Sequence, residues 1–177
     1  MTKQILLAGF GGQGILFSGK FLAYDGLIED KQVSWLPSYG PEMRGGTCNC
    51  SVIISDVKIG SPIVLNPDIL IAMNLPSLDK FESEAAPGAQ IFVDSSLIER
   101  KVERNDVEVY YIPATKLASE SGLTGLANMI MIGNMIKHTG IIPFENVEKI
   151  IEKIVPAKRQ AMRETNLKAI EIGYNFQ

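Results

Sequence analysis

The sequence predicts an α/β protein with a three-layer, Rossmann-like fold in which helices flank a mixed, mostly parallel sheet. Three observations lead to this prediction. Short apolar runs alternate with stretches of helical periodicity, a strand runs directly into a glycine-rich turn and a helix, and one strand follows its predecessor with too few residues between them for a helix. The chain has 177 residues, 46% of them apolar, which is enough to bury the core of one domain spanning residues 1–177.

The chain opens with a predicted unit of strand, turn and helix. Residues 4–8, QILLA, form an apolar run that meets a glycine, which is typical of a buried parallel strand. A helix is expected over residues 13–26, where apolar side chains recur near helical spacing. A second strand is expected over residues 32–37, QVSWLP, and a polar, glycine-rich loop over residues 38–46.

The third predicted strand, residues 47–55, alternates in polarity. This alternation places Cys48, Cys50, Val52 and Ile54 on one face of the strand. Because the preceding loop leaves no room for a crossover helix, we expect this strand to be antiparallel and the sheet to be mixed.

Beyond residue 56 the chain alternates between buried strands and helices, and after the last strand it is mostly helical. No internal repeat, low-complexity tract or linker interrupts this pattern. The expected strands cover residues 68–73, 89–94 and 107–113, and the expected helices cover residues 77–83, 114–121, 125–138, 144–154 and 156–172.

The composition argues against several classes of protein. A formal net charge of −3 gives no basic footprint for nucleic acid. No apolar run reaches the roughly 18 residues of a membrane helix, and the start of the chain lacks the apolar region of a signal peptide. The two cysteines do not make a disulfide framework. We therefore expect a cytoplasmic protein that binds neither nucleic acid nor a membrane.

The stretch LLAGFGGQGILFSGKFLA, residues 6–23, has G-x-G-x-x-G spacing through Gly9, Gly11 and Gly14, with a further glycine at Gly12. A strand followed by such a turn and a helix is the required context for a dinucleotide-binding fingerprint. Free N–H groups at a helix start can hold a phosphate, and glycine lets the backbone approach it. Three interpretations stay open: an NAD or FAD site, a bare structural turn, and a cradle for another phosphate-bearing ligand or a subunit contact.

The NAD interpretation lacks its specificity element. A dinucleotide site needs an acidic residue about 20 positions after the glycines, at the end of the second strand, to bind the ribose hydroxyls. That strand ends in SWLPSYG, which contains no Asp or Glu, and Asp30 precedes the strand. The glycine loop therefore favours a phosphate-bearing ligand other than NAD, or a subunit contact.

A second informative segment, SYGPEMRGGTCNCSVIISD, covers residues 38–56. Arg44 is its best candidate for binding an anion, because a guanidinium binds carboxylate or phosphate through two parallel hydrogen bonds. The alternative is that Arg44 pairs with Glu42 or stays solvated. This loop follows the second strand as the glycine loop follows the first. In a parallel sheet both would lie at the carboxyl edge, where open α/β folds bind ligands.

Three segments in order, AGFGGQGI, SYGPEMRGGTCNCSVIISD and IGSPIVLNPDILIAMN, make the chain resemble the gamma subunit of 2-oxoacid:ferredoxin oxidoreductases. The run WLPSYGPEMRGGTCNCSVIIS is most similar to the 2-oxoglutarate branch. The resemblance covers essentially the whole chain, including NMIMIGNMIKHTGIIP. It implies a subunit of a heteromer that converts a 2-oxoacid and coenzyme A to acyl-CoA and carbon dioxide, with electrons passing to ferredoxin.

The resemblance also implies how this work is divided. Partner alpha, beta and delta subunits would carry thiamine pyrophosphate and iron–sulfur clusters. This chain would supply assembly surface and part of the coenzyme A region, with no cofactor bound and no activity when alone. The sequence leaves open whether the isolated chain is a monomer or a homodimer. The alternative function is a free-standing oxidoreductase that uses the glycine loop for NAD(P). The candidate binding residues are Gly9, Gly11, Gly12, Gln13, Gly14, Tyr39, Arg44, Gly45 and Gly46.

The other chemically notable residues favour structural roles. Cys48 and Cys50 are closer together than the pairs of usual zinc and cluster motifs and have no partner cysteines, which suits small buried hydrophobes. His138, just before a glycine, is expected to serve the last carbonyls of a helix. Asn128 and Asn134 are expected to be hydrogen-bonded packing residues. We predict no catalytic residue and no metal ligand in this chain.

Overall fold

A single six-stranded sheet organises the protein, and the computed structural model describes residues 1–38 and 47–177. The strand order is β2-β3-β1-β4-β5-β6, with β1 and β4 at the centre of the sheet. The strands are β1 (Thr2–Phe10), β2 (Gln32–Ser38), β3 (Thr47–Ser55), β4 (Ile69–Ala72), β5 (Gln90–Asp94) and β6 (Glu108–Ile112).

The pairing confirms the predicted mixed sheet. Strand β1 pairs with β4 in parallel and with β3 antiparallel, and β4, β5 and β6 continue in parallel. Every residue of β1 from Thr2 to Phe10 has a partner in β3. This cross-strand pairing extends β1 at both ends, so the strand is longer than the apolar run at residues 4–8. Pro37 lies within β2, where an edge strand tolerates a missing N–H.

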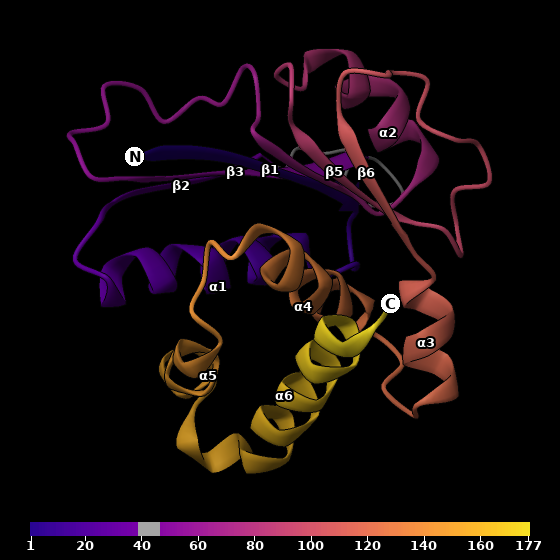
Figure 1. Cartoon of the computed structure of the whole chain (residues 1–177). Coiled ribbons are helices and arrows are strands. Elements are labelled where there is room, and N and C mark those ends of the chain that lie inside the picture. Colours follow the sequence, from indigo (N-terminus) through magenta and orange to yellow (C-terminus); the bar gives the residue numbers. More distant parts are fainter. Residues whose placement is uncertain (39–46) are drawn as a thin grey trace.

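The helices are distributed unequally between the two faces of the sheet (Figure 1). One face is covered by helices that share a single hydrophobic core with the sheet, whereas the other face carries α2 and connecting segments. The first set comprises α1 (Ile15–Ile28), α3 (Ala114–Glu120), α4 (Ala127–Thr139), α5 (Val147–Ile154) and α6 (Gln160–Asn175), and the second comprises α2 (Leu75–Phe81). This arrangement confirms the predicted three layers. Within the described ranges, no helix combines the length and apolar character that a membrane crossing requires.

Several helices begin elsewhere than the periodicity indicated. Helix α2 starts earlier, because Asn74 caps it with a 2.9 Å hydrogen bond from the Ser77 N–H to its Oδ1. The two C-terminal helices start later, because short 3₁₀ turns that follow Pro143 and Pro156 occupy the first residues of each predicted span.

The alternation predicted for β3 is confirmed. Cys48, Cys50, Val52 and Ile54 all belong to the core beneath the helical face, and both cysteines are free thiols. Burial raises the pKa of the Cys50 thiol to about 12. These thiols therefore act as small core hydrophobes, as predicted.

Helix α4 is buried between the sheet and α6, with every residue from Asn128 to Ile136 buried. The two helices cross at a pair of glycines. A Cβ on Gly133 would collide with the Ile170 carbonyl, and one on Gly173 would collide with the Ile130 carbonyl. Asn134 ties the crossing together by donating a 3.2 Å hydrogen bond to the Gly173 carbonyl. The α4–α6 contact thus requires glycine at both positions.

We expect Gly133→Ala to destabilise the fold by roughly 3 kcal/mol, because the added methyl group must push two backbones apart in a packed core. Gly60→Ala is the matched control. A Cβ there meets nothing within 4 Å, and the loss should stay below about 0.5 kcal/mol. Urea unfolding of both variants measures the difference. Equal stability of Gly133→Ala and Gly60→Ala would contradict the close crossing.

A buried acid connects α1 to the α4–α5 segment. Asp25 is 2% exposed, and Asn146 donates hydrogen bonds to its Oδ1 (3.3 Å) and to Glu29 Oε1 (2.6 Å). Burial raises the pKa of Asp25 to about 6, the hydrogen bond from Asn146 opposes that rise, and the nearby charge of Glu29 adds to it. At neutral pH the fold therefore carries the cost of a desolvated carboxylate.

This raised pKa predicts that stability falls as pH increases. The folded chain holds the Asp25 proton more tightly than the unfolded chain, so the stabilisation is complete below about pH 4 and is lost by about pH 6. A shift of about two pKa units corresponds to at most roughly 3 kcal/mol. Asp25→Asn should remove this dependence and stabilise the protein at pH 7.5 but not at pH 4.

Urea unfolding at both pH values measures this effect, with Asp30→Asn as the control because Asp30 is exposed and Asn tolerates its positive φ of 53°. An Asp25→Asn effect that is the same at both pH values would show that Asp25 is not the titrating group.

Candidate functional site

The glycine loop joins the end of β1 at Phe10 to the start of α1 at Ile15. Gly12 and Gly14 have φ values of 95° and 75°, in the region that favours glycine. The first turn of α1 carries no acidic side chain, and its N-cap residue, Gly14, makes no side-chain cap. Among the described residues, nothing accepts a hydrogen bond from the N–H groups of Gly12 or Gly14. With respect to the described residues, the loop thus presents unpaired amide donors at the positive end of a helix.

Gln13 fixes the shape of this loop. Its side-chain Oε1 accepts a 2.6 Å hydrogen bond from the Phe10 N–H, and its Nε2 donates a 3.0 Å hydrogen bond to the Met73 carbonyl. Its own N–H donates to the Phe10 carbonyl at 3.2 Å. The side chain therefore spans the gap between the loop after β1 and the end of β4. These internal bonds engage both polar atoms of the Gln13 side-chain amide, so its observed role is to shape the loop. The ligand contact predicted for Gln13 stays a prediction.

Two of the predicted glycines have packing reasons of their own. A Cβ on Gly9 would lie 2.6 Å from Gln13 Oε1, and a Cβ on Gly14 would collide with the Asn128 side chain. Gly12 differs, because a Cβ there would meet nothing within 4 Å. Gly12 is therefore a loop position that the described residues leave open to a ligand. Gly11 lies beside it, half-buried.

Asn128 anchors α4 against the loop, which confirms the prediction that it is a hydrogen-bonded packing residue. Its Nδ2 donates to the Gly14 carbonyl at 3.1 Å and to Ser18 Oγ at 3.0 Å. Its Oδ1 is buried without a hydrogen-bond partner among the described residues. Nothing in the local sequence marks this contact, because it joins residues more than 100 positions apart.

The second predicted loop, residues 38–46, falls almost entirely outside the described residues. Tyr39, Arg44, Gly45 and Gly46 lie outside the described residues. Its two flanking positions are known: β2 runs in the same direction as β1, because both are antiparallel to β3, and Thr47 pairs with Phe10. The residues on either side of this loop thus lie at the same edge of the sheet as the glycine loop, as predicted.

The sheet topology gives a structural reason against a dinucleotide site. In dinucleotide folds the strand beside β1 is parallel to it and ends with the acid that binds the ribose. Here that neighbour is the antiparallel β3, which begins at this edge with Thr47. Asp30 lies near the opposite edge, just before Gln32, which pairs with Ser55 beside the start of β1.

A cavity of about 330 Å³ adjoins the glycine loop at the carboxyl edge of the parallel strands. This edge is where open α/β sheets bind ligands. Segments that follow β1, β4, β5 and β6 all contribute to its walls, through Gly12, Gln13, Met73, Leu97, Thr115 and Ser119 among others. Sequence reasoning missed Leu97, Thr115 and Ser119, because only the fold brings these segments together.

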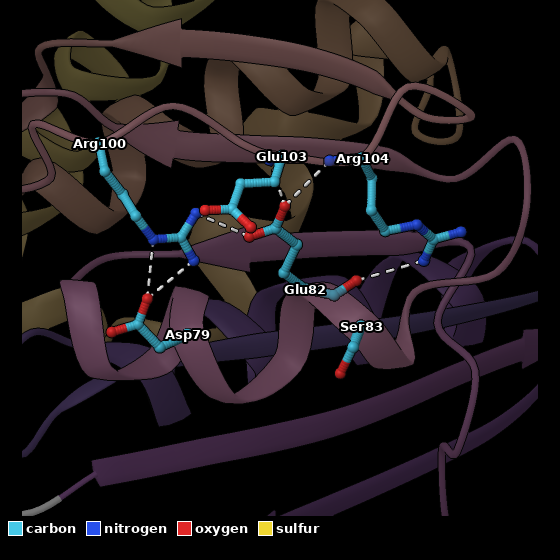
Figure 2. A pocket seen from close by; sticks show the side chains of 6 residues that line it. All are labelled: Asp79, Glu82, Ser83, Arg100, Glu103 and Arg104. Atoms are coloured by element: carbon cyan, nitrogen blue, oxygen red, sulfur yellow. Dashed lines mark hydrogen bonds and ion pairs between the residues drawn. The ribbon is translucent and has the colours of Figure 1, made fainter.

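A second cavity lies on the α2 face and contains a charged cluster (Figure 2). Arg100 forms ion pairs with Asp79 and Glu82, both at 2.8 Å. Glu82 also accepts hydrogen bonds from the backbone N–H groups of Glu103 (2.5 Å) and Arg104 (3.2 Å). Arg104 in turn forms an ion pair with Asp106. Because its cations already have carboxylate partners, this cluster ties α2 to the segment between β5 and β6.

His138 occupies a structural position. His138 stacks on Tyr110 with ring centroids 4.0 Å apart, and its backbone carbonyl accepts a 3.4 Å hydrogen bond from Gln90. Burial lowers the pKa of His138, and the charge of Lys137 adds to this. In residues 1–38 and 47–177, no group of three His, Cys, Asp or Glu side chains is placed to hold a metal ion.

Comparisons with known proteins found relatives that match nearly the whole chain. The sequence model described as pyruvate ferredoxin/flavodoxin oxidoreductase matches residues 4–176. The 2-oxoglutarate synthase subunit KorC of Methanocaldococcus jannaschii is 39% identical, covering 98% of this chain and 93% of that protein. The ketoisovalerate oxidoreductase subunit VorA of Methanothermobacter thermautotrophicus is 38% identical, but this chain spans only 35% of its length.

Two solved structures share the fold. The keto/oxoacid ferredoxin oxidoreductase gamma subunit of Geobacter sulfurreducens has a TM-score of 0.82 and 31% identity, with 97% of this chain and 96% of that one covered. The 2-oxoglutarate:ferredoxin oxidoreductase of Magnetococcus marinus, solved with 2-oxoglutarate, coenzyme A and succinyl-CoA, has a TM-score of 0.88 at 23% identity, covering 98% of this chain and 30% of that one. From its sequence match and its shared fold, the chain belongs to the pyruvate ferredoxin/flavodoxin oxidoreductase family.

Proposed function

We propose that this chain is the gamma subunit of a heteromeric 2-oxoglutarate:ferredoxin oxidoreductase. The support is a 2-oxoglutarate synthase subunit of nearly the same length at 39% identity, together with the fold of a gamma subunit at 31% identity. The enzyme would convert 2-oxoglutarate and coenzyme A to succinyl-CoA and carbon dioxide, with two electrons passing to ferredoxin. In this proposal residues 1–177 act as one domain of a cytoplasmic complex.

The chemistry is divided among subunits in this proposal. The alpha, beta and delta chains hold thiamine pyrophosphate, which supplies the carbanion chemistry of decarboxylation, and the iron–sulfur clusters, which carry the electrons. The two thiols of this chain are buried, and the pKa of Cys50 lies far above neutral pH. They are therefore unsuited to act as thiolate nucleophiles or cluster ligands. The chain contributes assembly surface and binds part of coenzyme A.

The observation that carries the coenzyme A proposal is the free amide array at Gly12 and Gly14. These N–H groups and the start of α1 can donate hydrogen bonds to phosphate oxygens, while the helix dipole favours the negative charge. Gln13 holds the loop in shape, so the donors need no reorganisation when the phosphate binds. The proposed site also includes Gly9, Gly11, Tyr39, Arg44, Gly45 and Gly46.

Reconstitution tests the assignment as a subunit. We expect the purified chain to show no reduction of a viologen dye, because it lacks the groups that form a carbanion or store electrons. The complex reassembled with its partner subunits should reduce the dye when both 2-oxoglutarate and coenzyme A are present. Dye reduction by this chain alone, or full activity of the complex without it, would contradict the proposal.

The cradle is tested by Gly12→Ala, with Gly88→Ala as the matched control. Both glycines have positive φ, 95° and 77°, and at both a Cβ meets nothing within 4 Å. Each alanine should cost about 1–2 kcal/mol of folding stability from backbone strain. Only Gly12→Ala should raise the KM for coenzyme A in the assembled enzyme, by about tenfold or more, because it alone displaces the phosphate-binding amides. An unchanged KM for coenzyme A in a folded, assembled Gly12→Ala enzyme would contradict the proposal and would show that the loop is only a structural turn.

A further inference from the structure

We propose that a second copy of this chain docks on the hairpin formed by α5 and α6, with the connecting turn of each copy seated in a groove of the other. The contact joins an acidic groove at one end of the hairpin to a basic turn at its opposite end. This inference uses neither coenzyme A nor the glycine loop. It therefore goes beyond the proposed function and is tested separately from it.

The groove lies between the start of α5 and the second half of α6, and its volume is about 360 Å³. Part of its lining is apolar. Val147 is buried, Leu167 is half-buried, and Phe144, which is 37% exposed, packs against the Tyr174 ring with centroids 4.3 Å apart. The remaining lining consists of three exposed glutamates, Glu145, Glu148 and Glu171.

These three glutamates have no cationic partner of their own. Within residues 1–38 and 47–177, none of the three carboxylates takes part in an ion pair. Their sequence neighbours Lys149 and Lys168 do not line the groove. Like charges around one groove repel one another, and a cation placed among them relieves this repulsion. The groove therefore fits a segment that carries both apolar and cationic side chains.

The turn between α5 and α6 is such a segment. It lies at the end of the hairpin that points away from the sheet (Figure 1), and every residue from Pro156 to Ala161 is exposed. Pro156 and Ala157 supply apolar surface, and Lys158 and Arg159 supply two cations. In the part of the chain that the structure describes, neither cation forms an ion pair.

The charges of this turn are unfavourable for α6 itself. Arg159 is the N-cap residue of this 16-residue helix, no side chain caps it, and the first turn contains no acidic residue. A helix start carries a partial positive charge, so Lys158 and Arg159 add to a positive potential that the first turn does not offset. Carboxylates supplied by a second molecule would stabilise this end of the helix.

A two-fold axis can satisfy groove and turn together. The buried residues of α6, such as Ala169 and Ile170, belong to the core, which leaves Leu167 and Glu171 on the outer side. Arg159 and Glu171 are about 18 Å apart along the helix axis. When two hairpins run antiparallel, the turn of each copy meets the groove of the other, and the same contact occurs twice. Parallel hairpins would instead place like charges together.

Sedimentation equilibrium of the purified full chain measures the association. We expect a reversible dimer at about 0.1 mM protein in low salt. Its dissociation constant should rise about tenfold or more between about 0.05 M and 0.5 M NaCl, because salt screens charges at the protein surface. A chain that stays monomeric up to about 1 mM in low salt, or a dimer that is insensitive to salt, would overturn the inference.

Charge reversal identifies the two surfaces. The turn variant carries Lys158→Glu and Arg159→Glu. The groove variant carries Glu145→Lys, Glu148→Lys and Glu171→Lys. Each variant should be monomeric alone, because its groove and its turn then carry charge of the same sign. An equimolar mixture should dimerise with a dissociation constant within about threefold of the native value, because each groove again meets a turn of opposite sign.

Two further variants serve as checks on folding and position. The turn variant places acids at the start of α6, where the helix dipole favours them, so its melting temperature should not fall. It therefore decides alone if the groove variant fails to fold, since it should be monomeric where the native chain dimerises. Glu152→Lys changes an exposed residue of α5 outside the groove and should leave the dissociation constant within about twofold.

Three outcomes of the charge reversal contradict the inference. A mixture of folded variants that stays monomeric would show that groove and turn do not meet. A turn variant that dimerises as the native chain does would exclude the turn. If the native chain is monomeric but the folded groove variant fails to assemble with the alpha, beta and delta subunits, the groove binds a different subunit and not a second copy.

Discussion

Strand β1 is paired along one side with β3 and along the other with β4, and this double pairing fixes the position of the glycine loop. The antiparallel partner covers every residue up to Phe10, so β1 cannot shift along the sheet without breaking the whole ladder. The loop therefore always emerges at the edge where β4, β5 and β6 also end. The same antiparallel partner removes the strand end that would carry the ribose acid of a dinucleotide site.

From this fixed point the site is held by a few long-range contacts. The Gln13 side chain bonds backbone groups of Phe10 and Met73, and Asn128 bonds the Gly14 carbonyl from the start of α4. These bonds hold the loop amides in place before any ligand arrives, so that little ordering remains to be done on binding. The unequal distribution of helices also helps to hold the site in place, because the helices that shape the cavity and the loop pack together on one face of the sheet.

Local sequence predicted much of this fold. Apolar runs and the glycine spacing indicated the first strand, the turn and α1, and the short connection indicated the antiparallel strand. Local sequence did not predict the length of β1, because the ends of this strand are set by pairing with β3 and not by apolar residues. It missed the internal role of Gln13, whose acceptor at Met73 is 60 residues away. The cavity was beyond prediction for the same reason, since four separate segments form its walls.

The central claim is that backbone amides of the glycine loop hold a phosphate of coenzyme A. The most direct measurement is a structure of the reassembled complex with coenzyme A bound. The account predicts pyrophosphate oxygens about 2.7–3.2 Å from the amide nitrogens of Gly12, Gly14 or Ile15. Coenzyme A bound with every phosphate beyond hydrogen-bonding range of residues 11–15 would contradict it.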